Sequence, residues 1–295
     1  MTYKSGFVTI IGRPNVGKST LTNQIIGQKI AIISDKPQTT RNKIQSVYTD
    51  DNFQIVFIDT PGIHRPKHKL GDYMVRMARE TLNEVDVILL VVDDSLTIGP
   101  GDNYILEELK QVNTPIILAI NKIDKINQDS FNQIYKSYDE MNIFADIVGI
   151  SALEGAHLGV LIKKIVDFLP EGPQYFPDNM VTDQPERLIV AEIIREKILH
   201  YTHEEVPHGV AVEVSVMKER DNKDIVDINA TIYCEKKSHK GIIIGKQGRK
   251  LKGVGKSARQ DIEKLLGSKV YLELWVKVKE DWRNNLNTLK TLGYK

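Results

Sequence analysis

Gly12-Arg13-Pro14-Asn15-Val16-Gly17-Lys18-Ser19 is the stretch of sequence that decides the fold of the first half of the chain. An apolar run precedes it at residues 7–11 and an amphipathic pattern follows over 18–27, so it joins a predicted strand to a predicted helix. This spacing is typical of a phosphate-binding loop, in which backbone N–H groups and the start of the helix face a phosphate. We expect Lys18 to lie near the β- and γ-phosphates of a nucleotide and the Ser19 hydroxyl to bind Mg²⁺.

A second motif, Asn121-Lys122-Ile123-Asp124, indicates which base the nucleotide carries. It follows the apolar run 116–120 and therefore lies at the carboxyl end of a predicted strand, where ligands bind in open α/β sheets. A carboxylate at Asp124 can accept hydrogen bonds from N1–H and the 2-amino group of guanine, which adenine does not offer. An unpaired carboxylate would be costly enough to reject the wrong base, so the sequence predicts guanine over adenine.

Around these motifs, the first 170 residues alternate short apolar runs with amphipathic helical patterns, which predicts an α/β domain with a mostly parallel sheet. Four prolines between 170 and 185 then indicate a linker over 171–184. Residues 185–295 change period and predict a smaller α+β domain that ends in a tail helix.

The overall composition is that of a globular protein. The 295 residues are 41% hydrophobic and 27% charged, which excludes a disordered chain and a coiled coil. No apolar run is long enough to span a membrane and the N-terminus has no signal-peptide core, so we expect a cytoplasmic location. The only cysteine, Cys234, excludes an intrachain disulfide.

The second domain has a strongly basic segment around Gly245-Lys246-Gln247-Gly248. Residues 236–259 include nine basic side chains and no acidic one, although the whole chain carries a net charge of only +1. A glycine loop between an apolar helical turn and a basic helix is typical of a KH domain, in which it clamps the backbone of about four single-stranded nucleotides. The order helix, strand, strand, helix, helix, strand fits the type II arrangement. We expect RNA contacts from Lys240, Gly245, Lys246, Gln247, Gly248, Arg249 and Lys250.

The two nucleotide motifs together resemble those of P-loop GTPases, and this resemblance implies further roles. Asn121 would brace the pocket, Lys122 would pack on the base, and the backbone of Ser151, Ala152 and Leu153 would close over the guanine oxygen. The string Asp59-Thr60-Pro61-Gly62 is similar to the segment that holds Mg²⁺ through Asp59 and meets the γ-phosphate with the Gly62 N–H. The resemblance also implies nucleotide contacts from Ile63, from Ile123 and from every residue of the phosphate-binding loop.

Residues 37–41 resemble the first switch of such GTPases. Its threonine hydroxyl would bind Mg²⁺ only with GTP; we favour Thr40, and Thr39 is the alternative. The residue after Gly62 is Ile63, where small signalling GTPases carry a water-orienting glutamine, so hydrolysis must be arranged differently.

Asn15 stands where potassium-activated GTPases have an asparagine, which suggests K⁺ as an activator. The alternative is that Asn15 is a turn residue bonded to its own backbone. Catalytic roles would then fall to Lys18, Thr40, Gly62 and Asn15, and Mg²⁺ to Ser19, Thr40 and Asp59.

Over essentially its whole length the chain resembles the Era family of ribosome-assembly GTPases, through GRPNVGKS, DTPGIHRPK, NKID, SAL, GKQG and LELWVKVKEDWRNN. The family has an apolar residue at position 63 as well. The resemblance implies a monomer that binds GTP or GDP, the 3′ end of 16S rRNA and the 30S subunit, with peripheral association at the membrane. Two alternatives stay open: a nucleotide-switched signalling GTPase with protein partners, and an RNA-binding module whose GTPase domain is very slow.

Overall fold

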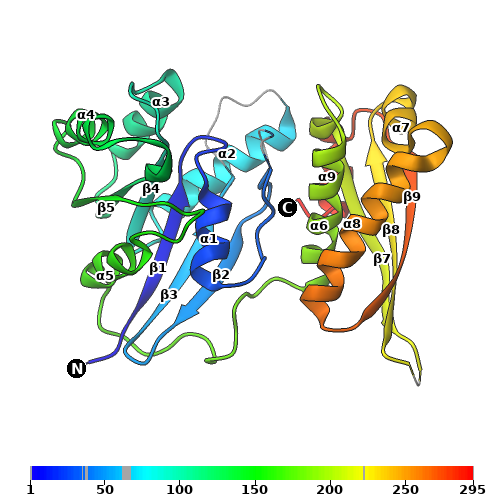
Figure 1. Ribbon diagram of the computed structural model, residues 1–295, viewed down its shortest axis with the longest axis horizontal. Coiled ribbons are helices and arrows are strands. Elements are labelled where there is room, and N and C mark those ends of the chain that lie inside the picture. The colour runs from blue at the N-terminus through cyan, green and yellow to red at the C-terminus, as the bar shows by residue number, and fades with distance from the viewer. Residues whose placement is uncertain (1, 35, 37–38, 62–67, 222, 295) are drawn as a thin grey trace. The chain divides into compact units, whose positions relative to one another are not determined.

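The computed structural model describes residues 2–34, 36, 39–61, 68–221 and 223–294 (Figure 1). The chain forms two compact units. The first consists of residues 1–31, 40–66 and 71–183, and the second of residues 32–39, 67–70 and 184–295. Among the described residues, no helix is both long and apolar enough to cross a membrane.

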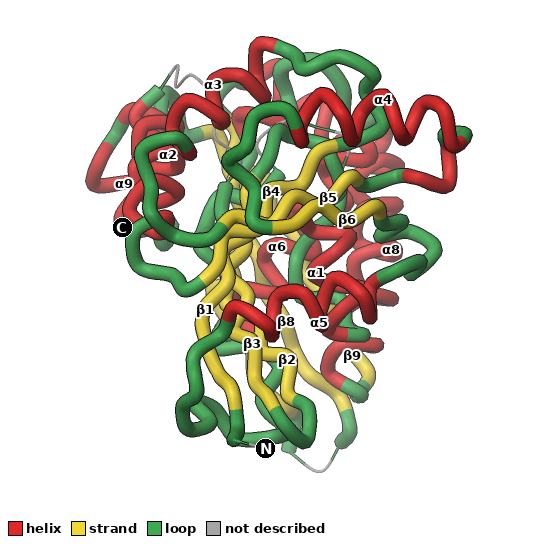
Figure 2. Tube along the Cα trace, turned by 90° about the vertical axis from the view of Figure 1, so that its left-hand side faces the viewer, coloured by secondary structure: helices red, strands yellow, loops and turns green. Residues whose placement is uncertain are grey.

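The first unit is built on a six-stranded sheet with the strand order β2-β3-β1-β4-β5-β6. Figure 2 shows β4, β5 and β6 running side by side. All neighbouring strands are parallel except β2, which pairs antiparallel with β3. The strands are β1 (Lys4–Ile11), β2 (Ile44–Thr49), β3 (Phe53–Asp59), β4 (Val87–Val92), β5 (Ile116–Ile120) and β6 (Asp146–Gly149).

Helices cover both faces of this sheet, which explains why its strands read as continuous apolar runs. All residues of β4 and β5 are buried. One core includes side chains of α1 and α5, and a second core on the other face includes side chains of α2, α3 and α4. The helices are α1 (Lys18–Ile26), α2 (Lys69–Leu82), α3 (Pro100–Leu109), α4 (Gln128–Asp139) and α5 (Leu158–Phe168). The predicted α/β domain with a mostly parallel sheet is confirmed.

The proline-rich segment after α5 packs along the first unit. The side-chain amide of Gln54 in β3 accepts hydrogen bonds from the backbone N–H groups of Tyr175 (2.9 Å) and Phe176 (3.0 Å). It also donates to the Phe176 carbonyl at 2.8 Å. The segment is therefore held to β3 over part of its length.

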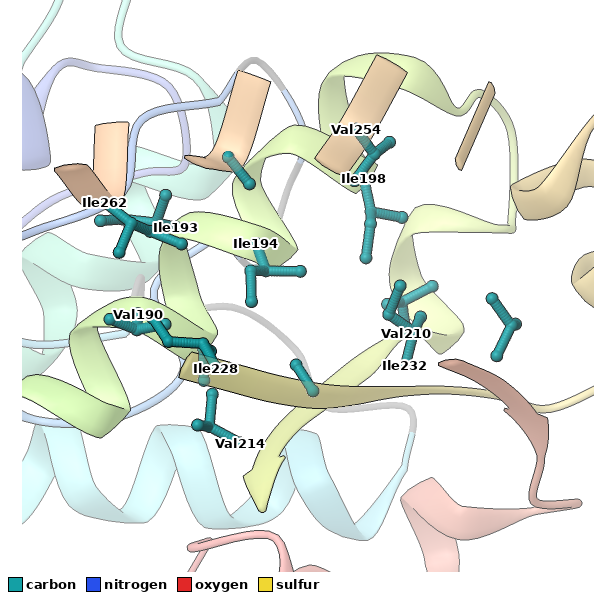
Figure 3. Close-up of a cluster of buried hydrophobic side chains, with 14 of the residues drawn as sticks. Val190, Ile193, Ile194, Ile198, Val210, Val214, Ile228, Ile232, Val254 and Ile262 are labelled. Atoms are coloured by element: carbon teal, nitrogen blue, oxygen red, sulfur yellow. The ribbon is translucent and has the colours of Figure 1, made fainter. Parts of the chain in front are cut away.

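The second unit has a three-stranded sheet in the order β7-β8-β9. β7 is antiparallel and β9 parallel to β8. Figure 3 shows the core, in which Ile194 and Ile198 of α6 lie with Ile228 and Ile232 of β8. The elements are α6 (Glu186–Tyr201), β7 (Ala211–Glu219), β8 (Ile225–Cys234), α7 (Lys237–Ile244), α8 (Arg249–Leu266), β9 (Lys269–Val278) and α9 (Leu286–Thr291). This order confirms the predicted small α+β domain.

Candidate functional site

The phosphate-binding loop connects β1 to α1. Gly12 and Gly17 have φ angles of 149° and 105°, and a Cβ at Gly12 would lie 2.3 Å from the Val91 carbonyl oxygen. Lys18 is buried, and its Nζ donates to the carbonyls of Gly12 (2.9 Å) and Arg13 (2.8 Å). Burial lowers the pKa of Lys18 to about 8, although the charge of Asp59 opposes the shift. The loop is thus curled around its own lysine, as a phosphate cradle requires.

Three side-chain oxygens converge at the start of α1. The Ser19 Oγ lies 3.2 Å from both the Thr40 Oγ1 and the Asp59 Oδ2, and the Thr40 Oγ1 lies 3.5 Å from the same carboxylate oxygen. The other oxygen of Asp59 is buried with no hydrogen-bond partner among the described residues, and burial raises the pKa of Asp59 to about 6, more than the charge of Lys18 lowers it. Octahedral Mg²⁺ places neighbouring ligands at about 3 Å from each other, so this set fits Mg²⁺.

Asn121 joins the base motif to two other segments. Its Nδ2 donates to the Val16 carbonyl in the phosphate-binding loop at 2.8 Å. Its Oδ1 accepts from the Ala152 N–H at 2.9 Å. A Cβ at Gly17 would lie 2.2 Å from the Asn121 Nδ2, so the contact tolerates only glycine. The side chain therefore fixes three segments at the carboxyl ends of β1, β5 and β6.

Asp124 lies in the short 3₁₀ helix Ile123–Lys125 that follows β5. The Ser151 hydroxyl donates to its Oδ1 at 2.5 Å, which orients the carboxylate, and the side chain stays open to solvent. Ala152 is buried beside the site, whereas Leu153 is 67% exposed. The structure thus brings together the predicted base-recognition residues from two separate loops.

Sequence reasoning missed Asp93, which directly follows β4. Its carboxylate forms ion pairs with Arg13 of the phosphate-binding loop (3.0 Å) and with Lys122 of the base motif (3.5 Å). Arg13 also pairs with the buried carboxylate of Asp102 in α3 at 2.7 Å. The available signal was a carboxylate at the end of a buried strand, the same signal that identified Asp124.

The two expected switch segments are described in part. Gly62 and Ile63 lie outside the described residues, as do positions 37 and 38. Thr60 is buried and its hydroxyl donates to the Ile10 carbonyl at 3.2 Å. Thr39 belongs to the second unit, where its hydroxyl donates to the Lys36 carbonyl (2.6 Å) and its own carbonyl accepts from Arg195. The sequence did not suggest this contact between Thr39 and Arg195 of α6.

The glycine loop of the second unit lies between α7 and α8. Gly245 has φ 71° and ψ 174°, which only glycine adopts readily, and a Cβ there would lie 2.7 Å from the Lys250 Cβ. Gly248 has φ 74° with open space around it. Lys246, Gln247 and Arg249 are exposed at the loop, and Lys240 and Lys250 are half-buried beside it. The predicted RNA-contacting residues therefore form one basic surface around the loop.

These features define a class: a P-loop GTPase domain followed by a KH domain. Family models agree, because one for a 50S ribosome-binding GTPase matches residues 7–122 and one for the KH domain matches residues 205–283.

The relatives define the family. The chain is 74% identical to GTPase Era of Alkaliphilus oremlandii, over 100% of both chains. It is 64% identical to GTPase Era of Clostridioides difficile, over 99% of each. It therefore belongs to the Era family, and it is a GTPase.

Solved structures of Era have the same fold. A crystal structure of Era in complex with MgGDPNP and nucleotides 1506–1542 of 16S ribosomal RNA is 45% identical, with a TM-score of 0.95 and 99% of each chain covered. Aquifex aeolicus Era bound to GDP·AlF₄⁻ is 44% identical, with a TM-score of 0.94 over 99% of each chain.

Proposed function

We propose that this GTPase binds 16S rRNA near its 3′ end through the KH domain and uses GTP hydrolysis to assist maturation of the 30S subunit. The observation that carries the proposal is the presence of two assembled sites in one chain. The first unit holds the phosphate-binding loop with its guanine motif, and the second holds the exposed basic loop at residues 245–248. The Era structure that contains a GTP analogue and 16S rRNA supports the pairing of these two ligands.

The residues around the phosphates would share the work of hydrolysis. Lys18, oriented by its two loop carbonyls, would stabilise charge on the β- and γ-phosphates. Mg²⁺ would be held by Ser19, Thr40 and Asp59, and when bound it neutralises charge on the phosphate oxygens. The convergence of hydroxyls supports Thr40 rather than Thr39 as the ligand, because the Thr39 hydroxyl is bonded to the Lys36 carbonyl.

Other parts of the proposal rest on the family resemblance. Gly62 would meet the γ-phosphate, and Asn15, which has a left-handed φ of 68° in the loop, would help to hold K⁺ as activator. We further propose a GTPase domain over residues 1–170, a linker over 171–184 and a KH domain over 185–295. The protein would act as a monomer in the cytoplasm, with peripheral association at the inner face of the membrane.

A single-turnover GTP hydrolysis assay with and without a 16S rRNA 3′-end fragment, in K⁺ and in Na⁺, tests the enzymatic part. We expect hydrolysis to be slow alone and faster with RNA, and K⁺ to increase the rate. Equal rates with and without RNA would contradict the link between hydrolysis and rRNA, and equal rates in K⁺ and Na⁺ would remove the role of Asn15.

RNA binding by the loop is tested with Gly248→Asp and its matched control Gly248→Asn. Both side chains fit the open space and tolerate the left-handed φ, so only the added negative charge differs. We expect Gly248→Asp to weaken binding of the RNA fragment at least tenfold and Gly248→Asn to weaken it much less, as measured by fluorescence anisotropy. Undiminished binding by Gly248→Asp would place the RNA elsewhere.

A further inference from the structure

The KH domain has a second surface, on the opposite side of its sheet from the core. Residues of β8 and β9 alternate, so that Ile228, Ile232 and Val276 face the helices. Figure 1 shows α6 and α8 on one side of this sheet. We define the outer sheet face as the residues of the other set: Ala211, Glu213, Val216 and Lys218 of β7, Ile225, Asp227, Asn229, Thr231 and Tyr233 of β8, and Lys269, Tyr271, Glu273, Trp275 and Lys277 of β9.

Trp275 is the most conspicuous side chain of the outer sheet face. It is 62% exposed in the middle of β9, and Tyr271 on the same strand is 50% exposed. The chain has two tryptophans, and the other, Trp282, is fully buried and donates its Nε1–H to the Gly209 carbonyl at 2.9 Å. Four residues of strand separate Trp275 from Tyr271 by about 13 Å. Trp275 is therefore not a residue of the hydrophobic core, unlike Trp282.

The acidic side chains of this face are already engaged. Asp227 pairs with Arg220 at 2.7 Å, and Arg220 also lies over the Tyr271 ring, 5.1 Å from its centroid. Glu213 accepts a hydrogen bond from the Tyr233 hydroxyl at 2.8 Å, and Glu273 accepts one from Tyr271 at 3.2 Å.

The lysines are exposed instead. Within the described part of the chain, Lys218, Lys269 and Lys277 form no ion pair and lie open to solvent. Glu213 and Glu273 keep their negative charge, because their hydrogen-bond donors are neutral tyrosine hydroxyls. The positive charge next to the accessible indole is therefore that of Lys277, two residues from Trp275 on the same face, and it suits a phosphate beside a stacked base.

The position of β9 connects this face to the basic glycine loop. β9 is an edge strand of the sheet and contacts both α7 and α8, the helices that flank residues 245–248. An RNA strand that leaves the loop can therefore cross the edge of β9 within the same domain.

We propose that the outer sheet face is a second single-stranded RNA contact, in which a base stacks on Trp275 and a neighbouring phosphate faces Lys277. The proposal rests on the proposed function, because it extends the RNA path beyond the glycine loop. A protein partner is the less suitable occupant, because Val216 is the only aliphatic residue more than a third exposed on the described part of β7, β8 and β9.

Tryptophan fluorescence of the full-length protein tests the stacking directly. Trp275 is open to solvent and Trp282 is not, so a stacked base should quench the Trp275 emission and protect it from acrylamide. The probe is the 16S rRNA 3′-end fragment, added to the parent protein and to Trp275→Phe. We expect quenching in the parent and little change in Trp275→Phe, in which only the buried Trp282 emits.

Anisotropy with the same RNA measures the contribution to affinity. We expect Trp275→Ala to weaken binding about tenfold, which corresponds to ~1.4 kcal/mol, and Trp275→Phe to stay within about threefold of the parent. Lys277→Gln should flatten the dependence of log affinity on log salt by about 0.7. Tyr135→Ala, which removes an exposed aromatic side chain from α4, is the matched control and should leave RNA binding unchanged.

The outcomes separate this inference from the function on which it rests. If Gly248→Asp loses RNA binding but Trp275→Ala binds like the parent and RNA leaves the Trp275 emission unchanged, the glycine loop is the RNA site and the outer sheet face is not part of it. If neither variant weakens binding, the proposed function itself fails. Quenching by intact 30S subunits but not by the RNA fragment would also overturn the proposal and indicate a protein partner.

Discussion

Asn121 and Lys18 organise the nucleotide site through hydrogen bonds within the protein. Asn121 uses both ends of its amide to join the phosphate-binding loop to the Ser151-Ala152 segment. Lys18 uses its ammonium group to hold the loop carbonyls in place. Because both side chains are buried, their positions are fixed by packing, and the site loses little conformational entropy when ligand arrives.

Lys18→Ala should abolish tight binding of both GTP and GDP. The ammonium group contacts charge that is present in both nucleotides, and its loss also leaves the carbonyls of Gly12 and Arg13 without a donor. We expect affinity to fall at least a hundredfold in isothermal titration calorimetry. Lys110→Ala, at an exposed lysine after α3, is the control. Binding by Lys18→Ala within tenfold of the parent would contradict the role of the loop.

Asp124→Asn should change the preferred base. The carboxylate accepts from two donors of guanine, whereas an asparagine amide has one accepting oxygen and turns its NH2 donor toward the other guanine donor. Xanthine has an oxygen at position 2, so the variant should bind XTP better than GTP and lose at least tenfold in GTP affinity. The measurement is competition between the two nucleotides, with Asp129→Asn on α4 as control. An unchanged preference for GTP would disprove the assignment.

At the scale of elements, the buried parallel strands were predictable and the antiparallel edge strand β2 was not. Residues 87–92 and 116–120 are apolar throughout because helices cover both faces of the sheet. Residues 44–49 form β2, but their sequence IQSVYT has no continuous apolar run, and their antiparallel pairing with β3 depends on tertiary contacts. We did not predict this strand.

Charged residues inside α6 show a second limit of sequence reasoning. Arg195, Glu196 and Lys197 are consecutive, and such a run normally indicates a solvent-exposed face, yet their exposed fractions are 0%, 1% and 8%. They are buried because partners far away in the sequence pair with them: Lys197 lies 2.5 Å from Asp261 of α8, and Arg195 donates to Thr39. Local periodicity carries no information about contacts of this range, which also explains why Asp93 was missed.

Asp93 should contribute stability that depends on pH. Burial alone would raise the pKa of Asp93, but hydrogen bonds from Ser95 and the charges of Arg13 and Lys122 outweigh it and lower the pKa. A carboxylate with a lowered pKa in the folded state stabilises the protein above its unfolded pKa of about 3.9, and this contribution disappears as pH falls through the folded pKa.

Asp93→Asn should therefore lower the free energy of unfolding by about 1.5 kcal/mol near pH 7 and by progressively less below about pH 4. Urea unfolding over a pH series measures this difference, with Asp139→Asn at an exposed position of α4 as control. A deficit that is constant with pH would show that the Asp93 charge is not involved.

At the scale of the whole molecule, the segment expected to sense the nucleotide is directly continuous along the chain with residues of the second unit. Thr40 lies in the first unit with Ser19 and Asp59, while Thr39, the preceding residue, belongs to the second unit. GTP and GDP differ only in the γ-phosphate, so the segment around Thr40 must order differently in the two states if it senses that group. Such a change would reach the residues next to Thr39 through the backbone.

RNA affinity should therefore depend on the bound nucleotide, and RNA should change the affinity for the GTP analogue relative to GDP by the same factor, because the two sites share one coupling free energy. We expect a factor of at least five, the lower end of typical couplings. Anisotropy with the 16S rRNA 3′-end fragment in saturating GDP or a non-hydrolysable GTP analogue measures the effect of nucleotide on RNA affinity. Nucleotide titration with and without RNA measures the effect of RNA on nucleotide affinity.

Thr40→Ala should abolish the difference in RNA affinity because it removes the hydroxyl that senses the GTP state, whereas Thr39→Ala should preserve it. If RNA affinity is identical in both nucleotide states, the two domains are merely tethered; if Thr39→Ala rather than Thr40→Ala removes the difference, the sensing hydroxyl is that of Thr39.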